Sequence, residues 1–452
     1  MALAFSSSAA VAATMLVLAP AAHAAGPAVT PLASFTGVDQ RAGGGASPPD
    51  PQIAAGPTSI LIAVNNRIQV RAKDGTILKN VTPNAFFGVS RRAEMSDPQL
   101  AYDPVAQRFF ATFMNVSRDA VLVGVSKTSD PTSSWTVAGF EYASGCPDQP
   151  HLGISNRVVA LSALLFPGGT CEEPGGTAPP RSDTIILNKA QLMGGDRTPA
   201  YQSFSTRGRF AGDTPAVSIT STTALAVADL DTSRPTTKIL FDFFKGAPPR
   251  GHFANNFTLT IPRIVSPPRS ANVEPEGKHL DLDDDRFRSG YQVGDVVYLA
   301  SQEACTPAGD TARRSCARVM GINVKTHTLV GSTDFGIPGE SVAYPAIAPD
   351  SSGNVWMAAG YFSPEVAPSV LGMAFRSDLT ASTDPVTLAA GDSPLTGVQP
   401  GLGVRFGDYY GASIDPANPA TVWVTGEFGQ NRLWNTQIAQ IGLDTPGTPI
   451  GG

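Results

Sequence analysis

The feature that most constrains the fold of this chain is a pattern that recurs seven times. Each unit opens with an acidic residue, continues into a short strand of small and apolar residues, and reaches a second apolar strand after a turn. The pattern is clearest at 97–103, followed by 108–114, and at 408–415, followed by 421–427. The units begin at Asp50, Asp97, Asp148, Asp213, Asp285, Tyr344 and Asp408, with Tyr in place of Asp in the sixth.

Units of this length predict small sheets arranged around an axis. Four strands of five or six residues with their turns need roughly 40–50 residues, and longer units carry longer loops. Seven such units arranged radially make a β-propeller, which leaves only short, protected edges. Small residues in the first strands, such as Ala54, Ala101 and Gly153, suit the crowded position beside a central channel. The sequence therefore predicts an all-β, seven-bladed β-propeller in a single domain, with an irregular multi-sheet sandwich as the alternative.

The two ends of the chain predict how the ring closes and where the protein works. The last unit offers three strands, at 409–414, 421–427 and 436–441, so the segment 29–35 is expected to supply a fourth and close the ring. Residues 1–24 carry no Lys, Arg, Asp or Glu and end in the small-x-small pattern of a signal-peptidase site, although the first Arg is Arg41. A first core helix is the alternative for this segment. The expected organisation is a signal peptide at 1–24, a lead-in with the closing strand at 25–49, the propeller at 50–445 and a tail at 446–452.

The four cysteines indicate an oxidising compartment, extracellular or periplasmic. They form two sequence-local pairs, Cys146 with Cys171 and Cys305 with Cys316, each bracketing one loop. Three pairings are formally open, and the local one is preferred. Export favours disulfides, and the CxxC-type spacing of a metal site is absent. We therefore predict a secreted protein with two disulfide bonds.

Composition agrees with many short strands and excludes some partners. The chain has 45 Gly and 39 Pro in 452 residues, and their combined share is well above the roughly 12% that these two residues have in an average protein. Only 15% of its residues are charged. A formal charge of −6 without a basic run argues against nucleic acid or anionic membrane as a partner. No run after residue 24 approaches the roughly 18 apolar residues that span a bilayer. The protein is expected to be a monomer.

Several segments resemble secreted bacterial β-propeller proteins of the sialidase-like, BNR/Asp-box-like type. The matching segments are 96–103, 126–135, 147–153, 284–287 and 405–416, and the resemblance spans roughly residues 45–442. It implies architecture rather than a reaction, because the group has no settled activity. A sialidase should carry several Asp-boxes of the form S-x-D-x-G-x-T-W, and only 350–356 comes close, with an extra residue.

The repeat predicts one place where polar groups converge. In a propeller, the start of each first strand and the end of each second strand meet at the same mouth of the channel. Such a ring of carboxylates suits a sugar or a cation, Ca²⁺ rather than Zn²⁺. Alternatively, each Asp accepts backbone N–H bonds at a turn, and the regularity of the slot favours this structural role. The predicted ring comprises Asp50, Asp97, Asp148, Asp213, Asp285 and Asp408.

Residues that depart from the repeat pattern are better candidates for catalysis than the repeated Asp residues. A general acid with a second carboxylate or tyrosine could cleave a glycosidic bond, and arginines (Arg67 among them) could hold a substrate carboxylate. A uronate-directed lyase would need a Tyr or His base and a neutralising Arg. Residues 281–285 match the opening of an EF-hand loop but lack its Gly, and are interpreted as a solvated acidic turn. The candidates are Tyr409, Glu427, Arg405, Tyr344, Arg286 and His151.

These observations lead to one expected function and one alternative. The first is a secreted propeller that binds an extracellular glycan or protein ligand at its channel mouth, without a recognised catalytic set or a required cofactor. The alternative is a carbohydrate-active hydrolase or lyase, sialidase-like or uronate-directed, with its site at the same mouth. Serine hydrolase and nucleotide chemistry have no support, because no GxSxG elbow or P-loop occurs.

Overall fold

The structure is a computed structural model that describes residues 28–142, 145–173, 179–206, 210–220, 222, 224–231, 235–254, 256–381, 383–399 and 403–443. The predicted signal peptide at 1–24 and tail at 446–452 lie outside these residues. Most of the regular structure is β. The helical elements are α1 (Pro83–Phe87), α2 (Lys189–Gly194) and the 3-10 turns η1 (Val116–Arg118), η2 (Arg269–Ala271) and η3 (Pro275–Gly277).

Four sheets have four antiparallel strands each. The first is β2 (Gln52–Ala55), β3 (Ser59–Val64), β4 (Arg67–Ala72) and β5 (Ile77–Val81). The second is β6 (Met95–Asp103), β7 (Arg108–Asn115), β8 (Ala120–Ser126) and β9 (Trp135–Glu141). The third is β25 (Ser341–Pro349), β26 (Val355–Phe362), β27 (Ser369–Phe375) and β28 (Val386–Ala389). The fourth is β31 (Gly411–Ile414), β32 (Val422–Gln430), β33 (Leu433–Leu443) and β1 (Val29–Asp39), which pairs antiparallel with β33.

The remaining strands form three sheets of unequal size. A five-stranded sheet holds β14 (Phe210–Pro215), β16 (Ala224–Asp231) and β17 (Thr236–Lys245), and both β18 (His252–Phe253) and β19 (Phe257–Ile264) pair with β17. A nine-stranded sheet runs in the order β13 (Tyr201–Ser205), β12 (Arg181–Asn188), β11 (Val158–Pro167), β10 (Gly145–Ile154), β15 (Val217–Ser218), β21 (Ser289–Val293), β22 (Val296–Cys305), β23 (Arg314–Asn323) and β24 (Thr328–Phe335). A small sheet joins β20 (Leu280–Asp281), β30 (Gly403–Arg405) and β29 (Val398–Gln399).

The sheets build a β-propeller, but the prediction of seven separate four-stranded blades is wrong. In the described residues, five sheets of four or five strands stand as separate blades. The strands β10 and β21, from two other repeat units, are joined into one sheet by β15, which pairs in parallel with both. The backbones can approach this closely because Gly153 has no side chain, and a Cβ there would lie 2.4 Å from Pro215 Cβ. Crowding at the axis therefore fuses two repeat units into one sheet.

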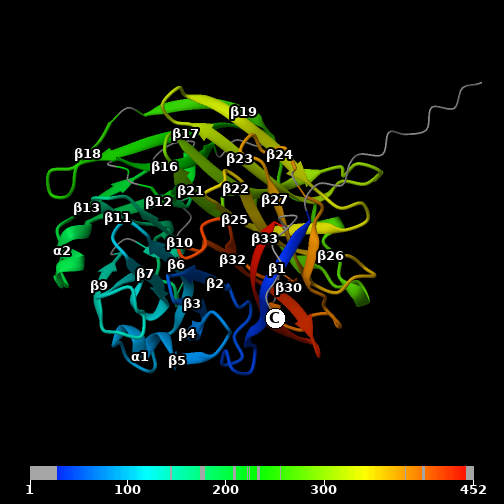
Figure 1. Ribbon diagram of the computed structural model, residues 1–452, viewed down its shortest axis with the longest axis horizontal. Coiled ribbons are helices and arrows are strands. Elements are labelled where there is room, and N and C mark those ends of the chain that lie inside the picture. The colour runs from blue at the N-terminus through cyan, green and yellow to red at the C-terminus, as the bar shows by residue number, and fades with distance from the viewer. Residues whose placement is uncertain are drawn as a thin grey trace, which may run out of the picture.

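The first strands of the repeat units surround the central channel. Figure 1 shows β2, β6, β10, β21 and β25 near the middle of the molecule and the later strands of each sheet farther out. Neighbouring inner strands contact one another around the axis, among them β2 with β6, β6 with β10, and β25 with β31. All six residues of β3 and all nine of β25 are buried, whereas the outer strand β5 is largely exposed. This explains why the inner strands are small and apolar in sequence.

Two buried tryptophans donate hydrogen bonds to the turns that join the first and second strands of their sheets. The Trp356 indole Nε1 donates to Asp350 at 2.8 Å, and the Trp423 Nε1 donates to Asp415 at 3.0 Å. Asp350 also accepts the backbone N–H of Asn354 at 2.9 Å. The Asp-box-like segment 350–356 is thus a structural turn, and Asp415 with Trp423 forms a second such turn that the sequence motif did not reveal.

The two predicted disulfides are confirmed with local pairing. Cys146 bonds Cys171 and Cys305 bonds Cys316, with Cα–Cα distances of 4.7 and 5.7 Å. Bonds of this kind are typical of oxidising environments such as the extracellular space. In the described part of the chain, no helix is long and apolar enough to cross a membrane.

Replacing Cys146 and Cys171 together by Ala is expected to lower the free energy of unfolding by about 3 kcal/mol. The bond closes a segment with a sequence separation of 25 and so restricts the unfolded chain. Denaturant unfolding of the double variant and the wild type under oxidising conditions measures the difference. Unfolding of the Cys305–Cys316 variant serves as the comparison, and an unchanged midpoint for the Cys146–Cys171 variant would contradict the expectation.

Candidate functional site at the channel mouth

A polar cavity of about 670 Å³ opens at one mouth of the channel. Four of the six predicted ring residues line it: Asp50, Asp97, Asp148 and Asp408. The cavity is also lined by residues that the repeat did not single out: Asp281, Asp283 and Gln149. We call this cavity the mouth cavity. It brings together side chains from several sheets and from the small sheet that contains β20 and β30.

The repeated slot is a backbone feature. Asp50, Asp97, Gln149 and Tyr344 have left-handed φ angles of 53°, 54°, 48° and 52°, and each precedes a proline. In three of these strands the pairing register shifts at this point, as in a β-bulge. A bulge bends its strand and redirects side chains, so the slot orients the first residues of each strand toward the mouth. In the third unit the left-handed residue is Gln149, one position after the predicted Asp148.

Side chains satisfy the backbone N–H groups of these bulges. Asn65 Nδ2 donates to Asp50 at 2.6 Å, and Asn65 Oδ1 accepts the N–H of Asp97 at 2.7 Å. Asp97 in turn accepts the N–H of Gln149 at 3.1 Å. Glu427 accepts the N–H of Gly407 at 2.7 Å. Asp97 thus accepts a backbone N–H at a turn, as in the structural alternative for the slot, and the catalytic candidate Glu427, which lies outside the slot, also accepts one.

The other two predicted ring residues lie elsewhere. Asp213 accepts hydrogen bonds from the hydroxyls of Thr184 at 2.6 Å and Thr206 at 2.8 Å. Asp285 is completely buried. Neither residue lines the mouth cavity, so the six acids do not form one site.

Asp281 and Asp283 of the acidic segment line the mouth cavity, and Asp283, although exposed, is held by hydrogen bonds. Asp283 accepts from Gln149 Nε2 at 2.6 Å and from Arg288 Nη2 at 2.7 Å. Burial alone would raise the pKa of Asp283, but the charges of Arg288 and Arg286 outweigh it and hold that pKa below its usual value. Asp283 is therefore an ionised acceptor fixed in place at neutral pH.

Two of the three arginines proposed to hold a substrate carboxylate are already paired with acids, and the third, Arg67, donates to the Ala42 carbonyl at 3.0 Å and does not line the mouth cavity. Arg405 donates to Asp281 at 3.2 Å and to Asp408. Arg286 forms ion pairs with Asp284 at 2.7 Å and with Asp283 at 3.3 Å. These contacts neutralise the guanidinium groups, so the geometry gives no support to recognition of a uronate or sialate carboxylate at this mouth.

Of the predicted base and tyrosine candidates, Tyr409 is completely buried and His151 is partly exposed. His151 lines a small cavity of about 40 Å³, with its ring 5.9 Å from that of Tyr409. Burial and the charges of Arg288 and Arg286 lower the pKa of His151 to about 3, too low for efficient proton transfer at neutral pH. Burial raises the pKa of Tyr409, and its neighbour Asp97 raises it further.

Tyr344 is likewise poorly placed for catalysis. It is completely buried, and its hydroxyl donates to the Asp281 carbonyl at 3.1 Å. Burial and the nearby Asp408 raise its pKa well above the usual value. A tyrosine nucleophile or base needs the opposite shift.

The carboxyl groups of the mouth keep protons to unusually high pH. Burial, together with the neighbouring Asp97, raises the pKa of Asp148 to about 7 and that of Asp50 well above its usual value. Burial and Asp50 do the same for Asp408. The charge repulsion expected of crowded carboxylates is thus relieved by protonation and by arginine pairing.

The geometry does not support a Ca²⁺ ion at the mouth. Among the described residues, the group whose possible ligand atoms lie within 4.8 Å of one another is Asp119 with Cys146 and Cys171. Both of these cysteines are in a disulfide and are not thiolate ligands. Calcium needs six to eight close oxygen atoms, and the described mouth carboxylates do not converge in that way.

No protein-family model matches the chain, and no curated protein matches it either. Similar solved structures include a protein of unknown function from Dyadobacter fermentans, with 10% identity and a TM-score of 0.42, covering 92% of this chain and 100% of that one. The Neurospora crassa Pan2 WD40 domain has 8% identity and a TM-score of 0.43, covering 93% and 96%. Drosophila Semaphorin 1b, extracellular domains 1–2, has 8% identity and a TM-score of 0.43, covering 92% and 87%. Likenesses this distant carry no argument about activity.

Proposed function

We propose that the protein binds an uncharged, hydroxyl-rich ligand, a glycan, in the mouth cavity. The observation that carries this proposal is a set of carboxylates held rigidly at the cavity wall while remaining partly accessible. The side chains of Asp281 and Asp283 are 18% and 27% exposed, and arginines fix both. Fixed carboxylates are strong acceptors for sugar hydroxyl groups, and charge-assisted hydrogen bonds are the stronger kind.

The size and charge of the cavity support the same ligand class. Its volume of about 670 Å³ lies within the range of roughly 300–1,000 Å³ for ligand pockets. Seven acidic residues and two arginines line it, and no lysine or histidine does. An anionic sugar would meet this acidic wall without a free cation, so a neutral glycan is favoured over a uronate or a sialylated one.

The two disulfides and the leader-like segment at 1–24 support a site of action outside the cytoplasm. We propose that the glycan is extracellular for this reason. The binding site then faces a compartment in which glycans are exposed.

A second candidate is hydrolysis of that glycan at the same mouth. Asp148 has its pKa raised to about 7, whereas the pKa of the neighbouring Asp283 is lowered. Two neighbouring carboxyl groups whose pKa values are shifted in opposite directions are typical of the general acid and its ionised partner in glycoside cleavage. In this candidate, Asp148 would be the acid and Asp283 the second carboxylate.

Calorimetric titration of neutral oligosaccharides into wild type and Asp281→Asn tests the proposal. We expect saturable binding to wild type and at least tenfold weaker binding to the variant, because a lost charged acceptor costs about 1.5–3 kcal/mol. Glu141→Gln, at a 66% exposed side chain on the outer strand β9 that does not line the mouth cavity, is the matched control and should bind normally. Equal affinity of both variants, or binding confined to acidic sugars, would contradict the proposal.

The same glycans distinguish binding from hydrolysis. Release of reducing ends by the wild type and its loss in Asp148→Asn, with binding retained, would establish the second candidate. Binding without turnover over a broad panel would leave the first.

A further inference from the structure

A second cavity, of about 560 Å³, lies at the edge of the nine-stranded sheet. Its walls come from the end of β19, the end of β22, the loop that joins β22 to β23, and the strands β23 and β24. None of its lining residues lines the mouth cavity. We call it the arginine pocket, defined by Arg263, Glu303, Arg313, Arg318 and Asp334.

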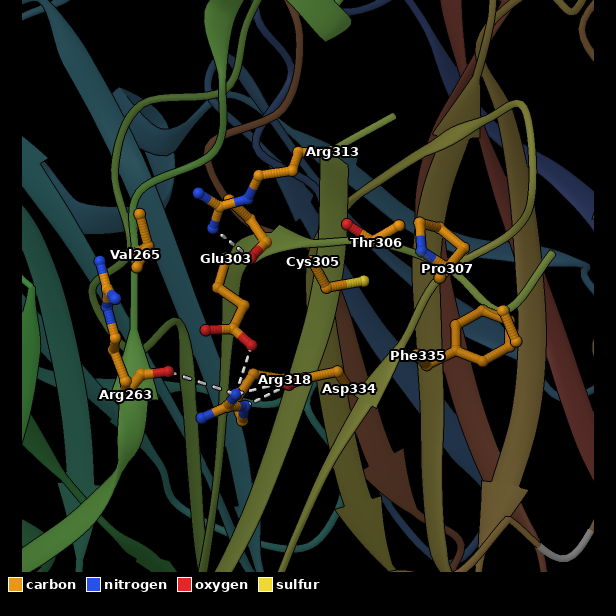
Figure 2. A pocket seen from close by; sticks show the side chains of 13 residues that line it. Arg263, Val265, Glu303, Cys305, Thr306, Pro307, Arg313, Arg318, Asp334 and Phe335 are labelled. Carbon is orange, nitrogen blue, oxygen red and sulfur yellow. Dashed lines mark hydrogen bonds and ion pairs between the residues drawn. The ribbon is translucent and has the colours of Figure 1, made fainter. Parts of the chain in front are cut away.

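The interior of the arginine pocket is electrically balanced. Arg318 forms ion pairs with Glu303 and, through two nitrogens, with Asp334 (Figure 2). Burial, together with the hydrogen bond to Asp334, raises the pKa of Glu303 to about 8, so Glu303 keeps its proton at neutral pH. The remaining Asp334 carboxylate then compensates the Arg318 charge.

Two further arginines line the pocket without such compensation. Arg263 and Arg313 are exposed, and Arg313 Nη2 donates to the Ala304 carbonyl at 3.0 Å. Within the described residues, neither guanidinium has a carboxylate within ion-pair distance, whereas Arg405 at the mouth pairs with Asp281 and Asp408. Figure 2 shows Glu303 between Arg313 and Arg318, with Arg263 to one side. The pocket therefore carries an excess of positive charge.

Both arginines stand on backbone that is tied down. Arg318 donates to the Pro262 carbonyl at 3.3 Å, next to Arg263. The Cys305–Cys316 disulfide closes the loop that carries Arg313, and Asp310 in that loop accepts the N–H of Gly339 at 2.9 Å. Cations held in position lose less entropy when they bind a ligand.

We propose that the arginine pocket binds a small ligand with an oxyanion group, held by Arg263 and Arg313. Guanidinium groups match the planar geometry of a carboxylate and also bind sulfate oxygens. The volume admits a molecule the size of a monosaccharide or somewhat larger. The carboxylate of an acidic sugar and inorganic sulfate present the same chemistry, and the experiment separates them.

Isothermal titration with sodium glucuronate, sodium sulfate and glucose at constant ionic strength tests this inference. Glucuronate is expected to bind saturably and glucose not to compete with it. Arg263→Gln and Arg313→Gln should each weaken binding at least tenfold. Arg91→Gln removes an exposed arginine elsewhere and should leave binding unchanged. Glucuronate that binds at least tenfold more tightly than sulfate identifies an acidic sugar as the ligand; equal affinities identify the bare oxyanion.

Absence of saturable binding by both anions would overturn the inference, as would equal losses in Arg91→Gln and in the pocket variants. Thermal unfolding of each variant verifies its fold, and Arg313→Lys, which keeps the charge, should retain part of the affinity. Asp281→Asn at the mouth should not change anion binding. Failure of this inference and failure of glycan binding at the mouth are therefore distinguishable.

Discussion

Raising the pH from 5 to 8 is expected to lower the free energy of unfolding by several kcal/mol. Burial is the largest cause of raised pKa values at Asp148, to about 7, Glu274, to about 7, and Glu303, to about 8. The ordinary values are 3.8 for Asp and 4.5 for Glu. Between pH 5 and 8 these three carboxyl groups bind more protons in the folded protein than in the unfolded chain, so stability falls as the pH rises.

Glu274 gives the size of the effect for one group. It is completely buried, with Oε2 accepting the Leu395 N–H at 2.9 Å, and its Oε1 has no hydrogen-bond partner among the described residues. A shift from 4.5 to about 7 corresponds to about 3 kcal/mol, at about 1.4 kcal/mol per unit. That stability is present below pH 4.5 and is lost as the pH rises through 7.

Groups with lowered pKa values offset only part of this fall. His151, with its pKa lowered from 6.5 to about 3, adds stability as the pH rises from 5 to 6.5, but it is one group against several carboxyls. Asp283 and Asp334 have pKa values below the usual one, so their contribution is present above about pH 4 and is lost only as the pH falls further. These two carboxyl groups lower the free energy of unfolding only at acid pH, and they do not cancel its fall between pH 5 and 8. Maximal stability is therefore expected near pH 4–5.

Urea unfolding at pH 5, 6, 7 and 8 measures this dependence. Glu274→Gln removes one titrating group, so its loss of stability between pH 5 and 8 should be about 3 kcal/mol smaller than that of wild type. The exposed Glu141→Gln should follow the wild-type curve. A wild-type stability that is flat or rises over this range would show that these carboxyls are ionised in the folded protein.

The propeller fold could be predicted from sequence because its period is local. Inner strands are buried along their length and read as short runs of small and apolar residues, as β2 and β25 do. The disulfides were predictable for the same reason, since each joins the ends of one loop. The number of separate blades was not predictable, because the parallel pairing of β15 with β10 and β21 joins segments far apart in sequence.

The candidate site was only partly predictable. The acids of the slot are visible as a repeat, and four of them do line the mouth cavity. The hydrogen bond between Asp283 and Gln149 could not be predicted, because the two residues lie 134 residues apart in sequence. The bulge formed by the repeated slot could not be predicted either, because a left-handed φ at a residue such as Tyr344 has no sequence signature comparable to glycine.

Replacing Lys189 by Met is expected to cost about 3–5 kcal/mol of unfolding free energy. Lys189 begins α2, and its ammonium group bonds the carboxylate of Asp103 and the carbonyl of Ser155, the latter at 2.7 Å. The Lys and Asp side chains are only 3% and 2% exposed. Removing the ammonium leaves a carboxylate buried without its counter-charge, which is the costly way to break such a pair.

A double variant separates the charge effect from packing. Asp103 also accepts the N–H groups of Val105 and Ala106, each at 2.9 Å. Asn at position 103 keeps an oxygen for this turn and removes the charge. Lys189→Met with Asp103→Asn is therefore expected to be at least 2 kcal/mol more stable than Lys189→Met alone, because the buried charge is gone.

The exposed pair of Arg118 and Glu141 provides the comparison. Its atoms are 3.5 Å apart and its side chains are 70% and 66% exposed, so Arg118→Met should change the unfolding free energy by less than about 0.5 kcal/mol.

Asp103 ends β6, whereas Ser155 follows β10 and Lys189 follows β12, so the Lys189 contacts join two neighbouring sheets of the propeller. A cost below 1 kcal/mol for Lys189→Met, or no recovery in the double variant, would mean that apolar packing alone holds these sheets together. The expected recovery would instead show that a buried ion pair fixes their contact.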